Sequence, residues 1–326
     1  MTKKNIEVDI NSIRISQDII RPFIKKIILR YSNFFSSLCQ GTVYLKLENS
    51  QLSNSFKVRG AFNKILCVTP EERKKGIITC SSGNHGLATA IVANKLNLSV
   101  KIIVPETAPK KKIDNIKEYA TELILYGDYD KAEKKALELA RKEKKTYISP
   151  YNDPDIIAGQ GTIGLEILEE FPEVEKVLVP VGGGGLIAGI AMAIKSENRS
   201  TEVIGVQSEA SPVMYESLKT GRILKSDEVK IKDSIADGLS GGIEEKSITF
   251  TIIKRYVNKL ILVKEESIKE AIKLLWEKDH QIVEGAGAVG VAALIENKEQ
   301  FKNIKTVIVI SGGNIDNLLF NKITKA

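Results

Sequence analysis

The chain has 326 residues, of which 43% are hydrophobic and 27% charged, a balance typical of a globular protein with room for two domains. No apolar run approaches the roughly 20 residues that a membrane span needs, and the first residues lack the apolar core of a signal peptide. The net charge of +7 comes with lysines that alternate with glutamates, as on solvated helix faces, and no nucleic-acid-binding motif is present. We therefore expect a cytoplasmic protein whose partners include neither a membrane nor a nucleic acid.

Cysteine and histidine are too few for a disulfide framework or a multi-histidine metal site. The three cysteines, Cys39, Cys67 and Cys80, show no CxxC spacing, and the two histidines are His85 and His280. These counts predict reduced thiols and argue against a zinc site.

Residue periodicity predicts strands that alternate with helices after a mixed N-terminal segment, residues 1–42, to which we assign no chemistry. The predicted strands are 43–48, 76–80, 100–104, 122–126, 176–181, 202–206, 260–263 and 305–310. The predicted helices start near residues 57 and 70 and then cover 87–96, 109–119, a charged stretch to about 144, 161–170, 186–195, 212–219, 266–280 and 286–295, with a loop at 221–233. Such alternation indicates an α/β fold with parallel sheets that carry helices on both faces.

The first predicted helix places one lysine, Lys57, directly after a strand and a polar turn. Asn54 or Ser55 can cap this helix, which puts Lys57 in its first turn. The positive end of the helix dipole then lowers the pKa of the ammonium group, and a neutral amine is a nucleophile that can form a Schiff base. Seen alone, however, Lys57 is more simply explained as one of many solvated helix lysines.

Three polar loops follow predicted strands, at 81–86 (SSGNHG), 182–185 (GGGG) and 311–314 (SGGN). In parallel α/β sheets, ligands bind at the carboxyl ends of the strands. The SSGNHG loop offers hydroxyls, an amide and backbone N–H groups that suit a carboxylate, although a plain capped helix start explains it equally well. The SGGN loop alone indicates only a turn, and His85 alone is more simply a hydrogen-bonded structural histidine.

The four glycines at 182–185 leave two ligand classes open. Consecutive backbone N–H groups between a strand and a helix form a cradle for one phosphate. The same stretch also satisfies a dinucleotide fingerprint, Gly183-x-Gly185-x-x-Ala188, with Glu209 about 20 residues further on. By itself this stretch does not distinguish a single phosphate from a dinucleotide.

Taken together, the motifs resemble one enzyme family. SFKVRGA at 55–61, SSGNHG, GGGGL and SGGN follow one another in this order, and the chain also contains AGQGT at 158–162, IADG at 235–238 and EGAG at 284–287. From about residue 44 to about 316 the chain closely resembles the threonine/serine dehydratases and serine racemases, which are fold-type II (tryptophan synthase β-like) pyridoxal-phosphate enzymes. No single motif is specific for this family, but the set is.

The resemblance implies roles for individual residues. Lys57 would hold pyridoxal 5'-phosphate as a Schiff base and then act as the base at Cα of the substrate. The implied cofactor-binding residues are Phe56, Lys57, Asn84, Gly182, Gly183, Gly184, Gly185, Leu186, Glu284, Ser311 and Gly312. The implied receptors of the substrate carboxylate are Ser81, Ser82, Asn84 and His85. Within these sets, Asn84 would bond the phenolic oxygen of the cofactor, the four glycines its phosphate, and Ser311 would face its pyridine nitrogen.

The same resemblance implies β-elimination from an amino acid. A hydroxyl such as that of Ser311 cannot hold a proton at the pyridine nitrogen as an aspartate would, so the ring is a weaker electron sink and loss of a β-leaving group competes well. We therefore expect an L-threonine dehydratase that gives 2-oxobutanoate and ammonia and also acts on L-serine to give pyruvate. Such an activity serves amino-acid catabolism or isoleucine biosynthesis.

Several residues leave alternatives open. Ser82 matches the acid/base serine of the racemases, on the face opposite the lysine, which makes serine racemase the alternative activity. The turn at 240–242 (SGG) is more typical of the dehydratases. At the family's divalent-cation site Glu209 is present, but Tyr215 stands in place of an aspartate, so we assign no metal. Outside the family, the glycine fingerprint keeps a dinucleotide-binding protein without pyridoxal chemistry as the alternative.

The implied architecture is two doubly wound α/β domains with the cofactor in the cleft between them. We expect a large domain of residues 1–75 and 151–326 and a small mobile domain of 76–150 that closes over the substrate. The family's Thr-Pro opening of the N-terminal segment is absent, which leaves substrate contacts from residues 20–42 undefined. The resemblance also implies a homodimer. Because the chain ends soon after Asn314, we expect no regulatory domain and no isoleucine feedback.

Overall fold

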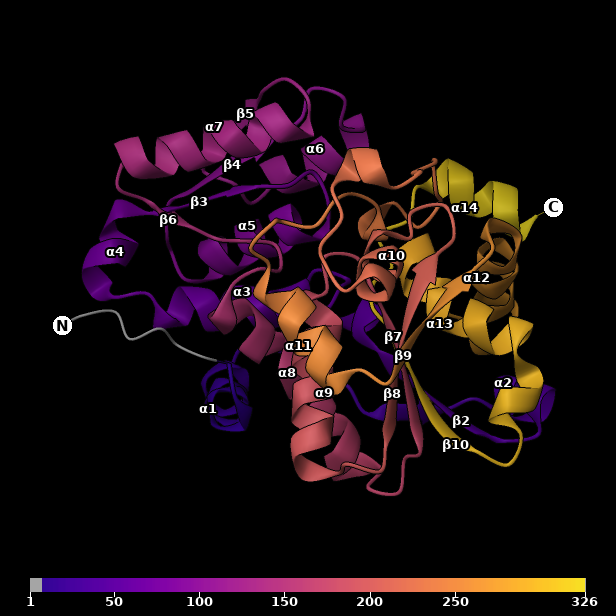
Figure 1. The fold of residues 1–326 in the computed structure, drawn as a ribbon. Helices are drawn as coiled ribbons and strands as arrows, with labels where there is room; N and C mark the ends of the chain where they lie inside the picture. The colour runs from indigo at the N-terminus through magenta and orange to yellow at the C-terminus, as the bar shows by residue number, and fades with distance from the viewer. Residues whose placement is uncertain (1–7, 326) are drawn as a thin grey trace.

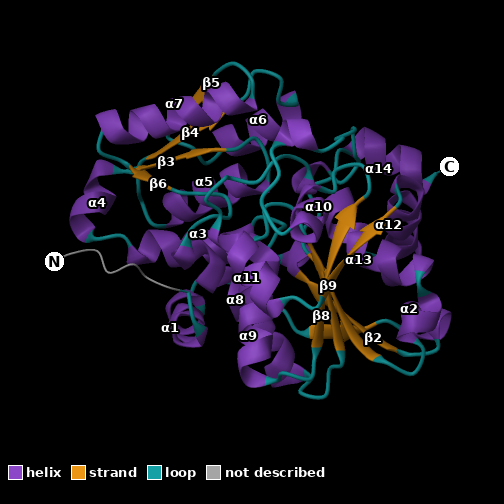
Figure 2. Cartoon of the chain, viewed as in Figure 1, coloured by secondary structure: helices purple, strands orange, loops and turns teal. Residues whose placement is uncertain are grey.

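The computed structural model describes residues 8–325 and contains two β-sheets, each with helices on both faces (Figure 1). Figure 2 shows the strands as two separate groups with helices between them. The α/β fold class predicted from the sequence is therefore confirmed. None of the helices in the described part of the chain is long and apolar enough to cross a bilayer.

The larger sheet has six strands in the order β1-β2-β10-β7-β8-β9. Their bounds are β1 Leu29–Tyr31, β2 Thr42–Leu47, β10 Lys305–Ile310, β7 Lys176–Pro180, β8 Glu202–Ser208 and β9 Lys259–Val263. All neighbours are parallel except the edge pair β1 and β2. In the register, Ile310 pairs with Leu47 and Ile308 with Leu178, so β2, β10 and β7 end side by side. The segments that follow these three strands therefore meet at one edge of the sheet.

Side chains alternate between two apolar layers across this sheet. Val177 and Val179 face one core, while Leu178 and Ile308 face the other. Helices of the first layer are α1 Ile10–Ile20, α8 Pro154–Glu170, α9 Gly185–Glu197, α10 Val213–Thr220 and α11 Ile248–Tyr256. Helices of the second layer are α2 Asn33–Cys39, α12 Glu265–Asp279, α13 Gly285–Glu296 and α14 Asn317–Thr324. Burial on both faces explains why the central strands are apolar throughout and not alternating.

The smaller sheet has four parallel strands in the order β5-β4-β3-β6. The strands are β3 Ile77–Cys80, β4 Val100–Val104, β5 Glu122–Leu125 and β6 Thr146–Tyr147. Helices α3 Lys57–Cys67, α5 Asn84–Lys95 and α6 Lys110–Lys117 cover one face, and α7 Tyr129–Lys142 covers the other, with α4 Pro70–Lys75 at the side. All four strands lie within residues 76–150. The division into a large domain of 1–75 and 151–326 and a mobile small domain stays a prediction.

Helix α3 packs against α5 of the smaller sheet and against α8 of the larger one. In Figure 1 it lies between the two groups of strands, together with α8. Because α3 begins at Lys57, the predicted reactive lysine lies where the two halves of the molecule meet.

The helix predictions differ from the structure at the start of α8, and they missed helices α1 and α2 in the N-terminal segment as well as α11 and α14. Helix α8 begins at Pro154, where the Asp153 side chain accepts hydrogen bonds from the first backbone N–H groups, and not at residue 161. Its glycines at 159, 161 and 164 weaken the helical signal but let neighbouring helices approach closely. Helices α11 and α14 were not predicted, because both are short and pack against other helices, α11 against α9 and α14 against α12.

Candidate active site

Lys57 is the first residue of α3, at the edge where the strands of the larger sheet end. The residue before the helix is Phe56, not Asn54 or Ser55 as predicted, and no side chain caps this helix end. The Phe56 N–H donates to the main-chain carbonyl of Ser311 at 3.1 Å, and Ser55 pairs with the next residue of the same loop. The backbone of the SGGN loop, and not a cap, thus holds the start of α3.

The Lys57 amine is turned into the protein. It donates a hydrogen bond to the Pro150 carbonyl at 2.8 Å and lies 5.2 Å from the centre of the Phe56 ring. Burial lowers the pKa of the amine to about 8, against the opposing effect of the Glu284 carboxylate. The lowered pKa agrees with the prediction, but its main cause is burial and not the helix dipole.

The four glycines connect β7 to α9 beneath an aromatic ring. A Cβ atom on Gly183 would come within 2.5 Å of the Tyr151 ring, and one on Gly185 within 3.0 Å of the same residue. Gly184 has a left-handed backbone (φ +88°) that a side chain would strain. Only glycine therefore fits between the loop and this ring. Because Tyr151 follows Pro150, one short segment contacts both the Lys57 amine and the glycine loop.

Asn84, Glu284 and Asn314 form a hydrogen-bonded chain. Asn84 opens α5 and donates through Nδ2 to Oε1 of Glu284 at 2.6 Å, while its Oδ1 accepts from Nδ2 of Asn314 at 2.7 Å. Asn314 also donates to the Ser53 carbonyl at 2.8 Å. These bonds fix the orientation of the Asn84 amide, and the second N–H of its Nδ2 remains for a further acceptor.

Glu284 is a buried acid at the start of α13. Burial raises the pKa of its carboxyl group to about 7, and the charge of Asp237 adds to the rise, against the hydrogen bond from Asn84. A Cβ atom on Gly312 would lie 2.3 Å from Oε1 of Glu284, so the glycine makes room for this side chain. The carboxyl group is accordingly near half protonation at neutral pH.

Ser311 and Leu186, both predicted to bind the cofactor, differ in what they can offer a ligand. Ser311 is buried directly after β10, with its hydroxyl 3.4 Å from the Ala286 carbonyl. The Leu186 side chain belongs to the core beside α9, so only its backbone can face a ligand at the helix start.

In the SSGNHG loop, some side chains are occupied by contacts within the protein. The Ser81 hydroxyl accepts a hydrogen bond from the Gly83 N–H at 3.1 Å, and the side chain of Ser82 is half-buried. The His85 ring is buried, with Nε2 3.0 Å from the Thr79 hydroxyl and 3.1 Å from a main-chain carbonyl. Any contact of His85 with a substrate carboxylate would therefore come from its backbone N–H.

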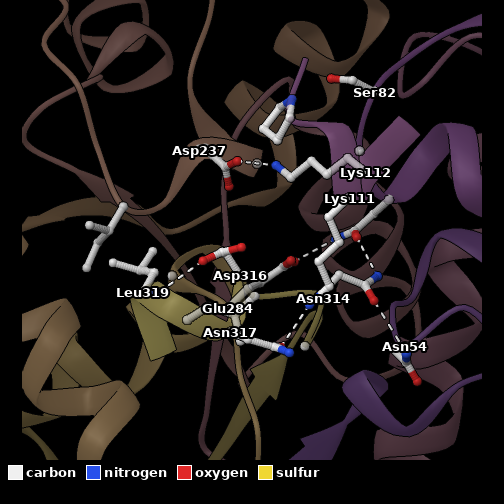
Figure 3. Close-up of a pocket in the computed structure, with 18 of the residues that line it drawn as sticks. Asn54, Ser82, Lys111, Lys112, Asp237, Glu284, Asn314, Asp316, Asn317 and Leu319 are labelled. Atoms are coloured by element: carbon white, nitrogen blue, oxygen red, sulfur yellow. Dashed lines mark hydrogen bonds and ion pairs between the residues drawn. The ribbon is translucent and has the colours of Figure 1, made fainter. Parts of the chain in front are cut away.

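A cavity of about 810 Å³ lies beside the asparagine chain, between α6 and the larger sheet (Figure 3). Ser82, Asn84 and Glu284 line it, and Lys112 of α6 forms an ion pair with Asp237 across it. Of the residues that the structure describes, neither Lys57 nor the glycines of 182–185 line this cavity. Lys57 and the glycine loop contact each other's neighbours through Pro150 and Tyr151, and the SGGN loop links them to the cavity residues Asn84 and Glu284. The two parts of the predicted site do not share one open pocket in the described part of the chain.

Glu209 follows β8 and is exposed to solvent. The backbone N–H of Tyr215 donates to the Gln207 side chain at 3.0 Å. Within residues 8–325 no group of three or more His, Cys, Asp and Glu side chains is arranged to hold a metal ion.

The residues at the strand ends fit pyridoxal 5'-phosphate. The glycine loop is a cradle that a single Cβ atom would fill, and it precedes a helix, which suits a phosphate. Lys57 offers an amine with a lowered pKa, Asn84 an oriented N–H group, and Ser311 a hydroxyl at the end of β10. Sequence reasoning missed Tyr151, which lies outside the motifs it singled out, and it gave no separate role to Asn314, the last residue of the SGGN loop.

Comparison with known proteins supports this assignment. A family model described as "Pyridoxal-phosphate dependent enzyme" matches residues 20–312. The L-threonine ammonia-lyase of Thermotoga maritima is 43% identical over 97% of this chain and 78% of its own. The catabolic L-threonine dehydratase of Escherichia coli K12 is 42% identical over 90% of this chain and 89% of its own.

A solved structure agrees with the sequence matches. Maize serine racemase superposes with a TM-score of 0.91, is 31% identical, and covers 98% of this chain and 97% of its own. The matches extend across both sheets and all the motifs described above. The chain therefore belongs to the pyridoxal-phosphate-dependent enzymes, and pyridoxal 5'-phosphate is its cofactor.

Proposed function

We propose that this chain is an L-threonine ammonia-lyase that converts L-threonine to 2-oxobutanoate and ammonia and converts L-serine to pyruvate and ammonia. The single observation that carries the proposal is the 42–43% identity, over 90% or more of the chain, to two enzymes named for this activity. The geometry supports it with a buried amine, a glycine cradle and a hydroxyl at the three adjacent strand ends.

Bound pyridoxal phosphate supplies an electron sink that acidifies the Cα–H bond of the amino acid and lets its β-hydroxyl leave. Lys57 anchors the cofactor through its amine and, once displaced by the substrate amine, takes the Cα proton. Its pKa of about 8 suits both tasks, because an amine with that pKa is partly neutral at physiological pH. The β-hydroxyl leaves as water, and hydrolysis of the released unsaturated amine gives the 2-oxo acid and ammonia.

The residues around Lys57 orient the reactants. Asn84 would hold the phenolic oxygen of the cofactor through its remaining N–H group, and the backbone of Gly182 to Gly185 would hold the phosphate. Ser81 and Ser82, with the backbone at the start of α5, receive the substrate carboxylate. The Ser311 hydroxyl, at the end of β10, would stand opposite the ring nitrogen of the bound cofactor, and a hydroxyl there instead of a carboxylate would favour elimination over a free carbanion.

Serine racemase is the second candidate function. It is favoured by Ser82, which lines the same cavity as Asn84, and by the maize serine racemase structure. A hydroxyl there can return a proton to the second face of Cα. The higher identities belong to the threonine enzymes, so racemisation is proposed as the lesser activity.

The test is an assay of the purified chain with pyridoxal phosphate. We expect formation of 2-oxobutanoate from L-threonine at a higher kcat/KM than pyruvate from L-serine, and loss of both in Lys57→Ala together with the cofactor absorption band. Chiral chromatography of the serine reaction measures D-serine. A main product of D-serine would replace lyase by racemase, and an absence of any cofactor band would contradict both.

The finer features of the enzyme are proposals as well. We propose a homodimer, which sedimentation tests, and a cytoplasmic location. All three cysteines are free thiols, and Cys39 and Cys80 are buried, which suits a reducing compartment. We also propose that the half of the molecule around the smaller sheet closes over the substrate, because the cavity lies between the two sheets and an ion pair spans it.

A further inference from the structure

Arg59, two residues after Lys57, is completely buried in a network of charged side chains. Nε and Nη2 donate to the two carboxylate oxygens of Glu48, both at 2.8 Å. Nη1 and Nη2 donate to the carboxylate oxygens of Glu166 at 2.6 and 2.8 Å, and Nη1 also donates to the Thr162 hydroxyl at 3.1 Å. These contacts use all five N–H groups of the guanidinium.

A second cation completes the network. Lys46 is also fully buried, with Nζ 2.7 Å from Glu166 and a further hydrogen bond to the Ile27 carbonyl. Although burial opposes it, the two carboxylates raise the pKa of Arg59, so the guanidinium stays charged. Arg59 and Lys46 thus pair with Glu48 and Glu166 inside the protein, where an unpaired charge would be costly, and Glu170 lies 3.9 Å from Lys46 at the edge of the network.

The network connects three elements around the start of α3. Lys46 belongs to β2, Glu48 to the short turn after it, and Glu166 to α8. Successive helix residues are rotated by about 100°, so side chains two positions apart project from nearly opposite sides. Lys57 accordingly points to the Pro150 carbonyl, while Arg59 points away from it into the network.

The backbone of the same turn is also held closely. A Cβ atom on Gly159 of α8 would lie 2.8 Å from the Arg59 carbonyl and from Cα of Gly60. On the other side, the Phe56 N–H is bonded to Ser311. The first turn of α3 is therefore held on one side by α8 and on the other by the Ser311 carbonyl. Arg59, which projects from this turn, is the largest fully buried side chain of the described residues.

We propose that Arg59, gripped by Glu48 and Glu166, is a positioning residue that fixes the first turn of α3 and thereby the direction of the Lys57 amine. This inference rests on the proposed role of Lys57. A fixed amine is a requirement of the chemistry, because a misplacement of about 1 Å at a reacting group can cost on the order of a hundredfold in rate. A lysine in place of Arg59 keeps the charge but cannot form the planar fork that holds two carboxylates.

The variants are Arg59→Lys, Glu166→Gln and, as matched control, Lys64→Met. Lys64 lies on the same helix and pairs with Asp153 and Asp155 at the start of α8, at 2.7 and 2.9 Å. The control therefore also removes an ion pair between α3 and the beginning of α8, but at the far end of α3 from its first turn. Each variant is assayed as holoenzyme for kcat, KM and the cofactor absorption band. The cofactor-free protein is treated with pyridoxal phosphate and borohydride across pH, and capture at residue 57 is measured by peptide mass spectrometry.

We expect Arg59→Lys to lower kcat by tenfold or more with KM within about threefold of wild type, as for a misplaced reacting group. Capture at Lys57 should slow and its half-maximal pH should rise, because a released amine gains access to water. Glu166→Gln should change the same readouts in the same direction by less, since Glu48 still holds the fork. Lys64→Met should lower the unfolding temperature but leave kcat, absorption and capture unchanged.

Two results would overturn the proposal. One is that Arg59→Lys and Lys64→Met change all readouts in parallel, which would make Arg59 a contributor to stability alone. The other is wild-type behaviour of Glu166→Gln in every readout, which decides the matter even if Arg59→Lys does not fold. Capture at a lysine other than Lys57 in the wild-type chain would instead refute the proposed function, so the two failures are distinguishable.

Discussion

Lys57 and Glu284 are a buried base and a buried acid whose pKa values move towards each other. Burial disfavours the charged form of each group, so the amine falls to about 8 and the carboxyl rises to about 7. Both groups therefore change protonation state near neutral pH, where their ordinary pKa values would leave them fully charged. The sequence could indicate a lowered pKa for Lys57 through its helix position, but not the burial that causes most of it.

Glu284→Gln should lower the pKa of Lys57 further, because the carboxylate is the group that raises it. The neutral amine increases as pH rises through its pKa, and only the neutral amine attacks an aldehyde. The half-maximal pH for borohydride capture of pyridoxal phosphate at Lys57 should therefore move below about 8 in this variant. Glu209→Gln, which removes an exposed carboxylate, is the control and should keep the wild-type midpoint. An equal or higher midpoint in Glu284→Gln would show that Glu284 does not act on Lys57.

Asn314→Asp should weaken cofactor binding by about tenfold, which corresponds to roughly one hydrogen bond lost from an oriented amide. The new carboxylate cannot donate to Oδ1 of Asn84, so the Asn84 amide loses the partner that fixes its orientation. Fluorescence titration of the cofactor-free protein measures the affinity. Asn54→Asp introduces the same charge at an exposed neighbour whose contact with Asn314 is 3.4 Å long, and it should have little effect. Equal losses in the two variants would indicate a general charge effect.

The elements that the sequence predicted well are those whose local pattern agrees with their burial. Strands β4 and β10 coincide with the prediction, and the other central strands differ from theirs by one or two residues, because an apolar run between turn residues can serve only a doubly covered sheet. The two-residue strand β6 and helices α11 and α14 have no such signal. Their conformation depends on the neighbours they pair or pack with, β3 for β6, α9 for α11 and α12 for α14, which no local window contains.

The site shows the same limit at the level of its loops. The motifs predicted which loops would hold the cofactor, because strand–glycine–helix connections have a local signature. The contacts between loops were not predictable: the Pro150 carbonyl at Lys57, the Tyr151 ring over Gly183, and the Asn314 amide at Asn84. Each joins residues that lie far apart in the sequence, and without an alignment nothing in the chain indicates such pairs.

Gly183→Ala should disrupt the glycine loop through Tyr151. The added Cβ atom would lie 2.5 Å from the ring, so either the ring or the loop must move, and cofactor affinity should fall by tenfold or more. Gly221→Ala is the control, because Gly221 has a left-handed backbone (φ +79°) but no neighbour within 4 Å of the added atom. It should lower the free energy of unfolding by about 1 kcal/mol without changing cofactor affinity.

A second variant identifies the ring as the cause. If the clash with Tyr151 weakens binding, Gly183→Ala combined with Tyr151→Ala should recover part of the affinity that Gly183→Ala alone loses. Tyr151→Ala alone sets the baseline, since the Tyr151 hydroxyl also accepts a hydrogen bond from the Glu244 N–H at 2.9 Å. If the losses of cofactor affinity in Gly183→Ala and Tyr151→Ala simply add in the double variant, the added methyl group disturbs the loop by a route other than the Tyr151 ring.

At the scale of the whole molecule, the two sheets meet through two kinds of contact. Behind the site, α3 and α8 are joined by buried charges and by close backbone packing, which make a fixed connection. In front of it, α6 reaches the other half by exposed or half-exposed side chains across the cavity: Lys112 to Asp237, and Lys111 to Asn317 at 2.8 Å. This asymmetry is suited to closure about α3 and α8, with the cavity as the side that opens.

The contacts across the cavity should therefore affect substrate binding more than stability. Surface ion pairs contribute about 0–1 kcal/mol, so Lys111→Ala with Lys112→Ala should leave the unfolding temperature nearly unchanged. The same variant loses the contacts that favour closure, and we expect a several-fold higher KM for L-threonine with a smaller change in kcat. Because salt screens exposed charges, KM of the wild type should rise between 0.05 and 0.5 M NaCl, while KM of the variant should respond much less.

The control for this prediction is Lys110→Ala with Lys117→Ala, which removes two lysines from the same helix without removing either cross-cavity contact. Its KM should stay near that of the wild type and keep the wild-type salt dependence. If both double variants raise KM equally, the net charge of α6 attracts the substrate and the individual contacts do not matter. If neither changes KM, the ion pair between Lys112 and Asp237 has no part in closure, and the motion must be controlled from α3 and α8, where the charges are buried.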